Sequence, residues 1–197
     1  MTSLIVIDVQ NDFCPNGALA VSGGDEIVPL INARMDKFKS VVLTQDWHPQ
    51  GHSSFASSHA DQDPYSVSDM PYGPQVLWPD HCVQGTKGAE FHAALETTRA
   101  DLIVRKGYNP QIDSYSAFFE NDKTTPTGLH GYLQERRIRE VTLVGLATDF
   151  CVAYSALDAA RLGYEVTVEQ DLCRAIDLDG SLATACQNMQ AAGVRLI

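Results

Sequence analysis

VTLVGLATDFCVAYSALDAARLGYEV, residues 141–166, combines three structural signals in one stretch. It begins with an apolar, strand-like run over Val141–Leu146, and a helical pattern follows over about residues 150–162. Gly163 falls where that helix should end, because glycine readily adopts the left-handed conformation that terminates many helices. Strand-forming residues then return, so the segment predicts a strand, a helix and a second strand of a parallel sheet.

The same alternation of strands and helices extends along the rest of the chain. Several of the strand candidates are almost continuously apolar, as expected of parallel strands that are covered on both faces. The predicted strands are Leu4–Val9, Ser40–Thr44, Asp101–Arg105, Val141–Leu146, Glu165–Val168 and Val194–Ile197. The predicted helices cover about residues 25–38, 88–98, 127–137, 150–162 and 180–192. We therefore expect an α/β domain with a doubly wound, mainly parallel sheet of about six strands.

The composition is that of a single globular domain over residues 1–197, with 44% hydrophobic and 20% charged residues. A net charge of −11 argues against general binding to nucleic acid or to anionic membranes. The five cysteines are odd in number and lack a C-x-x-C pair, which favours a reducing cytoplasm over a disulfide framework. The N-terminal MTSLIVIDVQ has no basic region before its apolar run, so we expect a strand there and not a signal peptide.

Residues 47–87 interrupt the alternation. They are rich in proline, glycine, serine, aspartate and histidine, and they show no clear periodicity. A loop of this length inside a compact domain is usually either functional or disordered. The aromatic residues and histidines within it favour a functional loop.

Four chemically capable residues follow predicted strands. They are Asp8, Asp46, Lys106 and Cys151. Because ligands bind outside the carboxyl ends of the strands in open α/β sheets, we expect these side chains to meet at one edge of the sheet. Taken singly, such residues are more often turn, cap or surface residues, and it is their joint placement that favours a functional site.

The position of Cys151 suggests a nucleophile. It falls in the first turn of a predicted helix, where unpaired N–H groups favour an anion and thiols can have lowered pKa values. A nearby carboxylate could accept the thiol proton, and an ammonium group could stabilise the thiolate. Backbone N–H groups around Ala147 and at Cys151 could hold an oxyanion. This pattern predicts acyl transfer without a catalytic histidine, although a small buried cysteine is the commoner case.

The long loop supplies a second group of residues. Asp46 and His48 are two positions apart, so an extended segment would place them on the same side. His81 lies further along the loop, and His52 is an additional candidate. One aspartate and two histidines with open positions suit Zn²⁺, Fe²⁺ or Mn²⁺ in a catalytic site. The alternative is that these histidines cap turns and cover the core.

Five segments resemble, in order and over essentially the whole chain, the nicotinamidase/pyrazinamidase family of isochorismatase-like hydrolases. They are VIDVQNDFCPNGALAV, TQDWHPQGHSSFA, WPDHCVQGTKGAEFH, VRKGYNPQIDSYSAFF and GLATDFCVAYSALDA. The resemblance implies a three-layer α/β/α fold. It also implies hydrolysis of nicotinamide to nicotinate and ammonia through a thioester, as a step of NAD salvage, with activity on pyrazinamide as well.

The resemblance also implies roles for individual residues. Those that match the family's catalytic triad are Asp8, Lys106 and Cys151. Those that match its metal ligands, for one divalent ion that is Zn²⁺ first and Fe²⁺ or Mn²⁺ otherwise, are Asp46, His48 and His81. The oxyanion hole, formed in the family at a cis peptide bond, corresponds to Ala147 and Cys151. The aromatic substrate pocket corresponds to Phe13, Trp78 and Tyr115, for which the alternative is an ordinary core position.

Some positions remain open at this point. Certain relatives use one more loop histidine, which would be His52 here, but the spacing before it varies. The other four cysteines lack a matching carboxylate and ammonium and are interpreted as structural; they are Cys14, Cys82, Cys173 and Cys186.

Two further functions compete with the nicotinamidase hypothesis. Another amidase or a vinyl-ether hydrolase of the isochorismatase type would share the fold, but those relatives generally lack the Asp-x-His…His set. A catalytically silent protein that binds small molecules would belong to a different class, but no triad position is replaced. We expect a cytoplasmic enzyme with a small-molecule substrate and no nucleic-acid or membrane partner, and the sequence leaves open whether it forms a homo-oligomer.

Overall fold

The expected strands form one parallel sheet in the computed structural model, which describes residues 1–197. The strand order is β5-β2-β1-β6-β7-β8, and every neighbouring pair runs parallel. The strands are β1 (Thr2–Ile7), β2 (Ser40–Asp46), β5 (Leu102–Lys106), β6 (Glu140–Leu146), β7 (Glu165–Arg174) and β8 (Arg195–Leu196). After β1, the strands β2 and β5 are added on one side of it, and β6, β7 and β8 are then added in turn on its other side. This confirms the doubly wound prediction and puts the switch point between β1 and β6.

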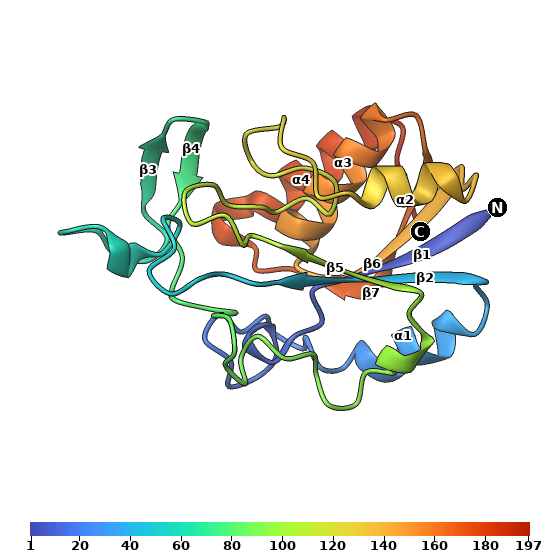
Figure 1. Ribbon diagram of the computed structural model, residues 1–197, viewed down its shortest axis with the longest axis horizontal. Helices are drawn as coiled ribbons and strands as arrows, with labels where there is room; N and C mark the ends of the chain where they lie inside the picture. The colour runs from blue at the N-terminus through green and yellow to red at the C-terminus, as the bar shows by residue number, and fades with distance from the viewer.

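Helices cover both faces of the sheet and make three layers (Figure 1). On one face lie α2 (Leu129–Glu135), α3 (Ala153–Arg161) and α4 (Ser181–Ala191), and on the other lies α1 (Val28–Met35). Helices α3 and α4 are each followed by a glycine with positive φ, Gly163 (86°) and Gly193 (81°), as their sequences predict. None of the helices combines the length and the apolar composition that a membrane span requires.

The helix predicted over residues 88–98 is wrong. This segment pairs its backbone with the turn after β1, because Asn11 N donates to Glu90 O (3.0 Å) and His92 N donates to Val9 O (2.9 Å). An isolated bridge also joins it to that turn, and only a short 3₁₀ turn, Thr97–Arg99, follows. These long-range hydrogen bonds use the same groups that a helix would need, so tertiary pairing overrides the local pattern.

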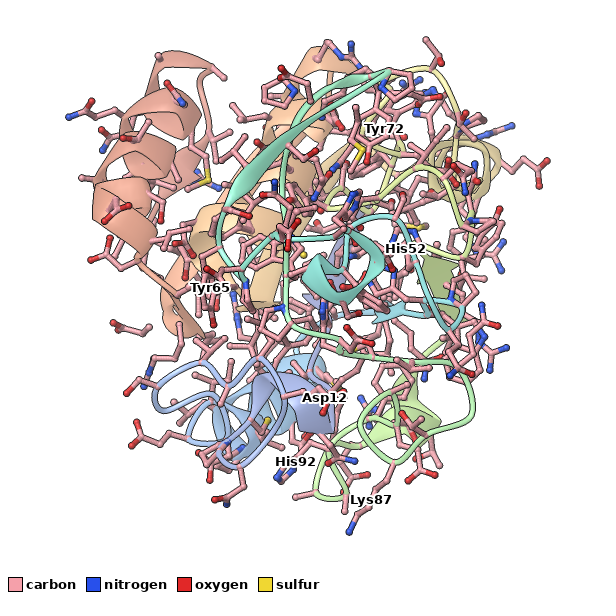
Figure 2. The ribbon with its side chains drawn as sticks, turned by 90° about the vertical axis from the view of Figure 1, so that its left-hand side faces the viewer. Asp12, His52, Tyr65, Tyr72, Lys87 and His92 are labelled. Carbon is pink, nitrogen blue, oxygen red and sulfur yellow. The ribbon has the colours of Figure 1, made fainter.

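The long loop contains more regular structure than its sequence predicts. Within it, β3 (Val67–Met70) and β4 (Gly73–Val76) form an antiparallel hairpin. The hairpin stands at the end of the molecule where the parallel strands end (Figure 1). Figure 2 looks onto this end, with Tyr65 and Tyr72 of the hairpin region in its upper half and Asp12, Lys87 and His92 in its lower half.

A glycine near the end of β6 allows the central strands to approach closely. Gly145 has a φ of +118°, and a Cβ atom there would overlap the backbone of Ile7 on β1. The pairing of β6 with β7 is irregular at the same point, between Leu143 and Gly145. Glycine is required where two backbones come this near. The close approach brings the ends of β1 and β6 together at the switch point.

Candidate active site

The four strand-end residues converge around the Lys106 ammonium group. Its Nζ lies 2.8 Å from Asp8 Oδ2 and 2.5 Å from Asp46 Oδ1. It also lies 3.5 Å from Cys151 Sγ and donates a 2.8 Å hydrogen bond to the Ser114 carbonyl. All four predicted side chains are buried. Residues far apart in the sequence thus share one enclosed site at the carboxyl edge of the sheet.

Asp8 is a buried carboxylate with two polar partners. It follows β1 with a φ of +48°, and Thr44 Oγ1 donates to its Oδ1 at 2.6 Å. Burial raises the pKa of Asp8 to about 6, because the charge loses its water, while the Lys106 ammonium partly offsets this effect. The group therefore binds a proton more readily than an exposed aspartate does.

Cys151 differs from the sequence expectation in two respects. It lies in a π-helical turn, Thr148–Val152, that precedes α3. Its pKa is raised well above the ordinary thiol value, because burial, together with Asp8 and Asp46, outweighs the opposing effect of Lys106. The expectation of a lowered thiol pKa is thus wrong. The thiol is protonated at rest, and the Asp8 carboxylate, with an oxygen within 4.8 Å of Cys151 Sγ, is placed to accept its proton.

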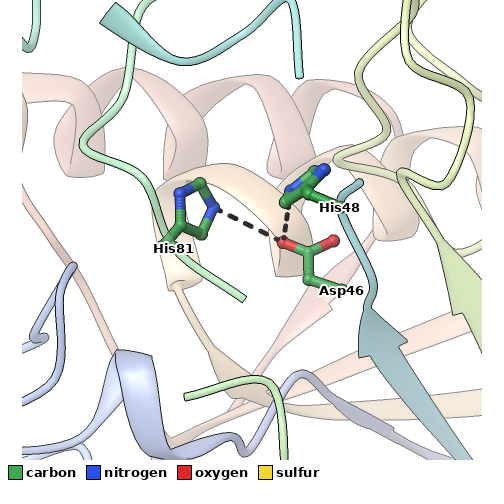
Figure 3. A group of neighbouring side chains, drawn as sticks. All are labelled: Asp46, His48 and His81. Atoms are coloured by element: carbon green, nitrogen blue, oxygen red, sulfur yellow. Dashed lines mark ion pairs between the residues drawn. The ribbon is translucent and has the colours of Figure 1, made fainter. Parts of the chain in front are cut away.

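Asp46, His48 and His81 meet beside the thiol. His48 Nδ1 donates to the Gly107 carbonyl (2.9 Å) and His81 Nδ1 to the Pro79 carbonyl (2.8 Å), since a carbonyl oxygen only accepts. In the neutral form of each ring, the Nε2 atom then carries the lone pair. Although burial opposes it, Asp46 and Asp113 raise the pKa of His48, so in the metal-free protein this ring binds a proton more readily than a free histidine does. The two Nε2 atoms face Asp46 Oδ2 at 3.6 and 3.9 Å (Figure 3).

The donor set fits a divalent transition metal ion. His48 Nε2 is buried and has no hydrogen-bond partner, which is costly unless a cation occupies its lone pair. Burial and the neighbouring His48 lower the pKa of His81 to about 4, and a neutral imidazole is the form that ligates a metal. Backbone carbonyls hold the Nδ1–H of both rings, as is usual for metal-bound histidines.

Two supporting residues were not recognised from the sequence. Gln10 Nε2 donates to the Asp46 carbonyl and Gln10 Oε1 accepts from the Asp46 N–H, both at 2.8 Å. Gly107 has a φ of +67°, and a Cβ atom there would overlap the ring of His48. Their positions in the sequence could have indicated a role in the site, because Gln10 lies two residues after Asp8 and Gly107 directly follows Lys106.

His52 lies outside the Asp46–His48–His81 group. Its Nδ1 pairs with Ser54 Oγ (2.8 Å) and its Nε2 with the Asn109 carbonyl (2.7 Å). Both ring nitrogens are therefore engaged by the protein. This geometry favours a structural role for His52, which packs against the His48 ring with centroids 4.5 Å apart.

A largely apolar pocket lies beside the thiol and the metal group. Its walls include the three aromatic residues expected from the sequence, Phe13, Trp78 and Tyr115. Phe150 adds a fourth ring, which packs edge-on against Trp78 with centroids 4.8 Å apart. The remaining lining residues are Leu19, Asp46, His81, Asp113, Ala147, Cys151 and Ile176. Asp113, Phe150, Leu19 and Ile176 were missed by the sequence analysis.

The backbone at the pocket wall has an unusual conformation. The peptide bond between Leu146 and Ala147 is cis, and it is one of the two bonds, with Ala147–Thr148, in the region that matches the family's cis peptide. Ala147 and Cys151 both line the pocket, so this turn lies next to the space that a bound molecule would fill. All five cysteines are free thiols, and burial raises the pKa of Cys14 to about 11 and that of Cys173 to about 12. Only Cys151 lines the pocket, which is what distinguishes it from the four cysteines interpreted as structural.

A buried thiol, carboxylate and ammonium group at the switch point of a doubly wound sheet define the cysteine hydrolases of the three-layer α/β class. The chain belongs to the isochorismatase family, because the sequence profile of that family, described as "Isochorismatase domain", matches residues 2–197. A nicotinamidase from Acinetobacter baylyi is 56% identical over 195 residues, which cover 99% of this chain and 91% of that protein.

Solved structures agree with this assignment. An Acinetobacter nicotinamidase/pyrazinamidase (A. baumannii) has a TM-score of 0.98 and 55% identity, and the match covers 100% of this chain and 95% of the other. A pyrazinamidase from Pyrococcus horikoshii, solved in complex with zinc, has a TM-score of 0.79 and 35% identity, and the match covers 100% and 98% of the two chains.

Proposed function

We propose that this protein hydrolyses nicotinamide to nicotinate and ammonia, and that it also acts on pyrazinamide. The observation that carries the proposal is the pocket, whose aromatic walls enclose a space lined both by the Cys151 thiol and by Asp46 and His81 of the predicted metal group. Nicotinamide is a flat ring with a carboxamide at one position and a basic nitrogen at another. It therefore offers an electrophile to the thiol and a lone pair to a metal. The nicotinamidases among the relatives support this substrate.

The first half of the reaction forms a thioester. Asp8 takes the proton of Cys151 as Sγ attacks the carboxamide carbon, so a C–S bond forms and the carbonyl oxygen becomes an oxyanion. The backbone N–H groups of Ala147 and Cys151 hold that charge. Asp8 then gives its proton to the amide nitrogen, the C–N bond breaks, and ammonia leaves. Lys106 stays beside both Asp8 and Cys151 and moderates the repulsion between the two anionic forms.

The second half regenerates the thiol. Asp8 accepts a proton from a water molecule that attacks the thioester carbon, and the C–S bond breaks to release nicotinate. The proton returns from Asp8 to Cys151. Because Asp8 serves as base and then as acid in each half, a pKa near 6 suits both roles. In the cell this activity would belong to cytoplasmic NAD salvage.

We assign one divalent metal ion to this site, with Zn²⁺ as the first choice. One Asp46 oxygen and the Nε2 atoms of His48 and His81 would hold it. When bound, such an ion supplies a Lewis acid for the ring nitrogen and for water. The zinc complex of the Pyrococcus relative supports the choice of Zn²⁺, and Fe²⁺ or Mn²⁺ would suit the same donors.

Metal removal is expected to reduce turnover more than tenfold. Chelation takes away the ion itself, and the substitution His48→Ala or His81→Ala takes away one of its proposed ligands. Metal content by elemental analysis and ammonia release are measured on the same samples. His92→Ala is the matched control, because it removes a histidine outside this group. Metal-free protein with full turnover would refute the metal assignment.

Ammonia release from purified protein separates the three candidate functions. A nicotinamidase produces equal amounts of ammonia and nicotinate from nicotinamide. A vinyl-ether hydrolase of the same fold would leave nicotinamide intact and cleave isochorismate instead. A silent binding protein would bind nicotinamide without releasing any product, and that result would overturn the proposal.

A further inference from the structure

Asp113 is a buried carboxylate that the reaction scheme above does not use. It is 2% exposed and lies in the pocket wall. The only basic group within ion-pair distance is His48, whose Nε2 lies 3.9 Å from Asp113 Oδ1. That same Nε2 atom is the buried nitrogen without a hydrogen-bond partner. Asp113 therefore contacts the proposed metal site through His48, and its carboxylate lies within 4.8 Å of ligating atoms of His48 and His52.

Neutral donors hold Asp113 in this orientation. Gln75 Nε2, from β4 of the hairpin, donates to Oδ2 at 2.9 Å, and the Ser114 N–H donates to Oδ1 at 2.7 Å. Asn121 Nδ2 donates to Gln75 Oε1 at 3.1 Å and so fixes the Gln75 amide. These bonds satisfy oxygen lone pairs but bring no positive charge. The hairpin thus positions a carboxylate whose only basic neighbour at ion-pair distance is the His48 ring.

The charges of the site differ in how well they are compensated. Asp8 and Asp46 both pair with Lys106. Asp113 adds a third carboxylate, but Lys106 is the only ammonium group, so two negative charges remain when His48 is neutral, the form that ligates a metal. A divalent cation would balance them. Because Lys106 pairs with Asp8 and Asp46, Asp113 is the one of the three carboxylates without an ammonium partner.

We infer that Asp113 is a further residue of the metal site, where its carboxylate raises the affinity for the divalent cation from beside His48. The inference rests on the metal assignment in the proposed function. Residues that support metal ligands from outside the coordination set commonly change metal affinity by 10–100-fold when they are replaced. Asp113 acts through the cation and positions it; it has no role in the acyl-transfer steps.

Zn²⁺ binding to the metal-free protein tests the inference directly. Competition with a chromophoric chelator measures the Kd, and we expect Asp113→Asn to weaken binding by about 10–100-fold. Asp113→Glu keeps the charge and should retain most of the affinity. Glu120→Gln is the matched control, because it neutralises another buried carboxylate of the same segment, one that bonds to Asn109 outside the pocket. An unchanged Kd in Asp113→Asn would overturn the inference.

Thermal unfolding separates this role from a structural one. Without metal, the Tm of Asp113→Asn reports how much the contacts of this carboxylate with Gln75 and His48 contribute to the fold. With Zn²⁺ present, its gain in Tm should be smaller than that of the wild type. A lower Tm without metal, combined with an unchanged Zn²⁺ Kd, would show a merely structural role and overturn the inference.

The result is distinguishable from a failure of the proposed function. If the wild type binds Zn²⁺ and releases ammonia while Asp113→Asn binds Zn²⁺ equally well, only the inference about Asp113 fails. If the wild type releases no ammonia from nicotinamide, the proposed function fails whatever the Zn²⁺ affinities are. Should Asp113→Asn not fold, Asp113→Ser removes the same charge and carries the same expected loss of affinity.

Discussion

Replacing Cys151 with alanine should lower the rate of nicotinamide hydrolysis by at least about three orders of magnitude, roughly 4 kcal/mol in the barrier. The thioester cannot form without Sγ, and no second thiol reaches the pocket, where Cys151 is the only cysteine among the lining residues. The change removes one small buried group and adds no charge, so the fold should persist. Ammonia release gives the rate, and intact-protein mass spectrometry under rapid quench detects the acyl group in the wild type alone.

Cys186→Ala is the control for that experiment. Cys186 is a free thiol on α4, it is partly exposed, and it does not line the pocket. Its removal should leave turnover unchanged. Near-normal hydrolysis by Cys151→Ala would rule out covalent catalysis by this residue, even if the protein proved to be a nicotinamidase.

Lys106→Met should reduce the catalytic rate by at least about two orders of magnitude, which corresponds to roughly 2.7 kcal/mol. The substitution leaves Asp8 and Asp46 without their shared cation, and it removes the charge that counters the effect of burial on the Cys151 thiol. The thiol pKa should therefore rise further. In an alkylation–pH profile read by peptide mapping at Cys151, the reactive range should shift to higher pH.

Removing one partner of a buried ion pair destabilises a protein. The folded fraction of Lys106→Met must therefore be known before its catalytic rate is compared with that of the wild type. Circular dichroism and titration of nicotinamide binding supply it. Lys87→Met is the matched control, since Lys87 lies on the same end of the molecule but outside the pocket (Figure 2). An alkylation–pH profile identical to that of the wild type would exclude Lys106 from the mechanism.

Much of the site's location could be predicted because one topological rule governs it. Asp8, Asp46 and Lys106 each lie at a strand's end, and in a doubly wound sheet those ends share an edge. Strand periodicity is a local signal, so the six strands were recoverable from the sequence. The aromatic pocket depended on family resemblance, since aromatic residues in a loop carry no local sign of where they point.

The parts that were missed depend on long-range contacts. The segment at residues 88–98 has a helical pattern, but the turn after β1 captures its backbone hydrogen bonds. The raised thiol pKa of Cys151 follows from burial and from carboxylates on other strands, neither of which a helix position reveals. The orientation of Asp113 depends on a hydrogen bond from Gln75, which lies 38 residues earlier in the chain, so no local sequence pattern indicates it.

The single ammonium group between Asp8 and Asp46 makes the nucleophile and the metal site parts of one thermodynamic system. A cation between the two histidines would face Asp46 Oδ2, while Lys106 pairs with Oδ1 of the same carboxylate and with Asp8. Linkage is reciprocal, so a chemical change at Cys151 must alter cation affinity by the same factor by which the cation alters the thiol equilibrium. Substitutions that change the affinity of this site for a metal would therefore also change the proton equilibria of Asp8 and Cys151.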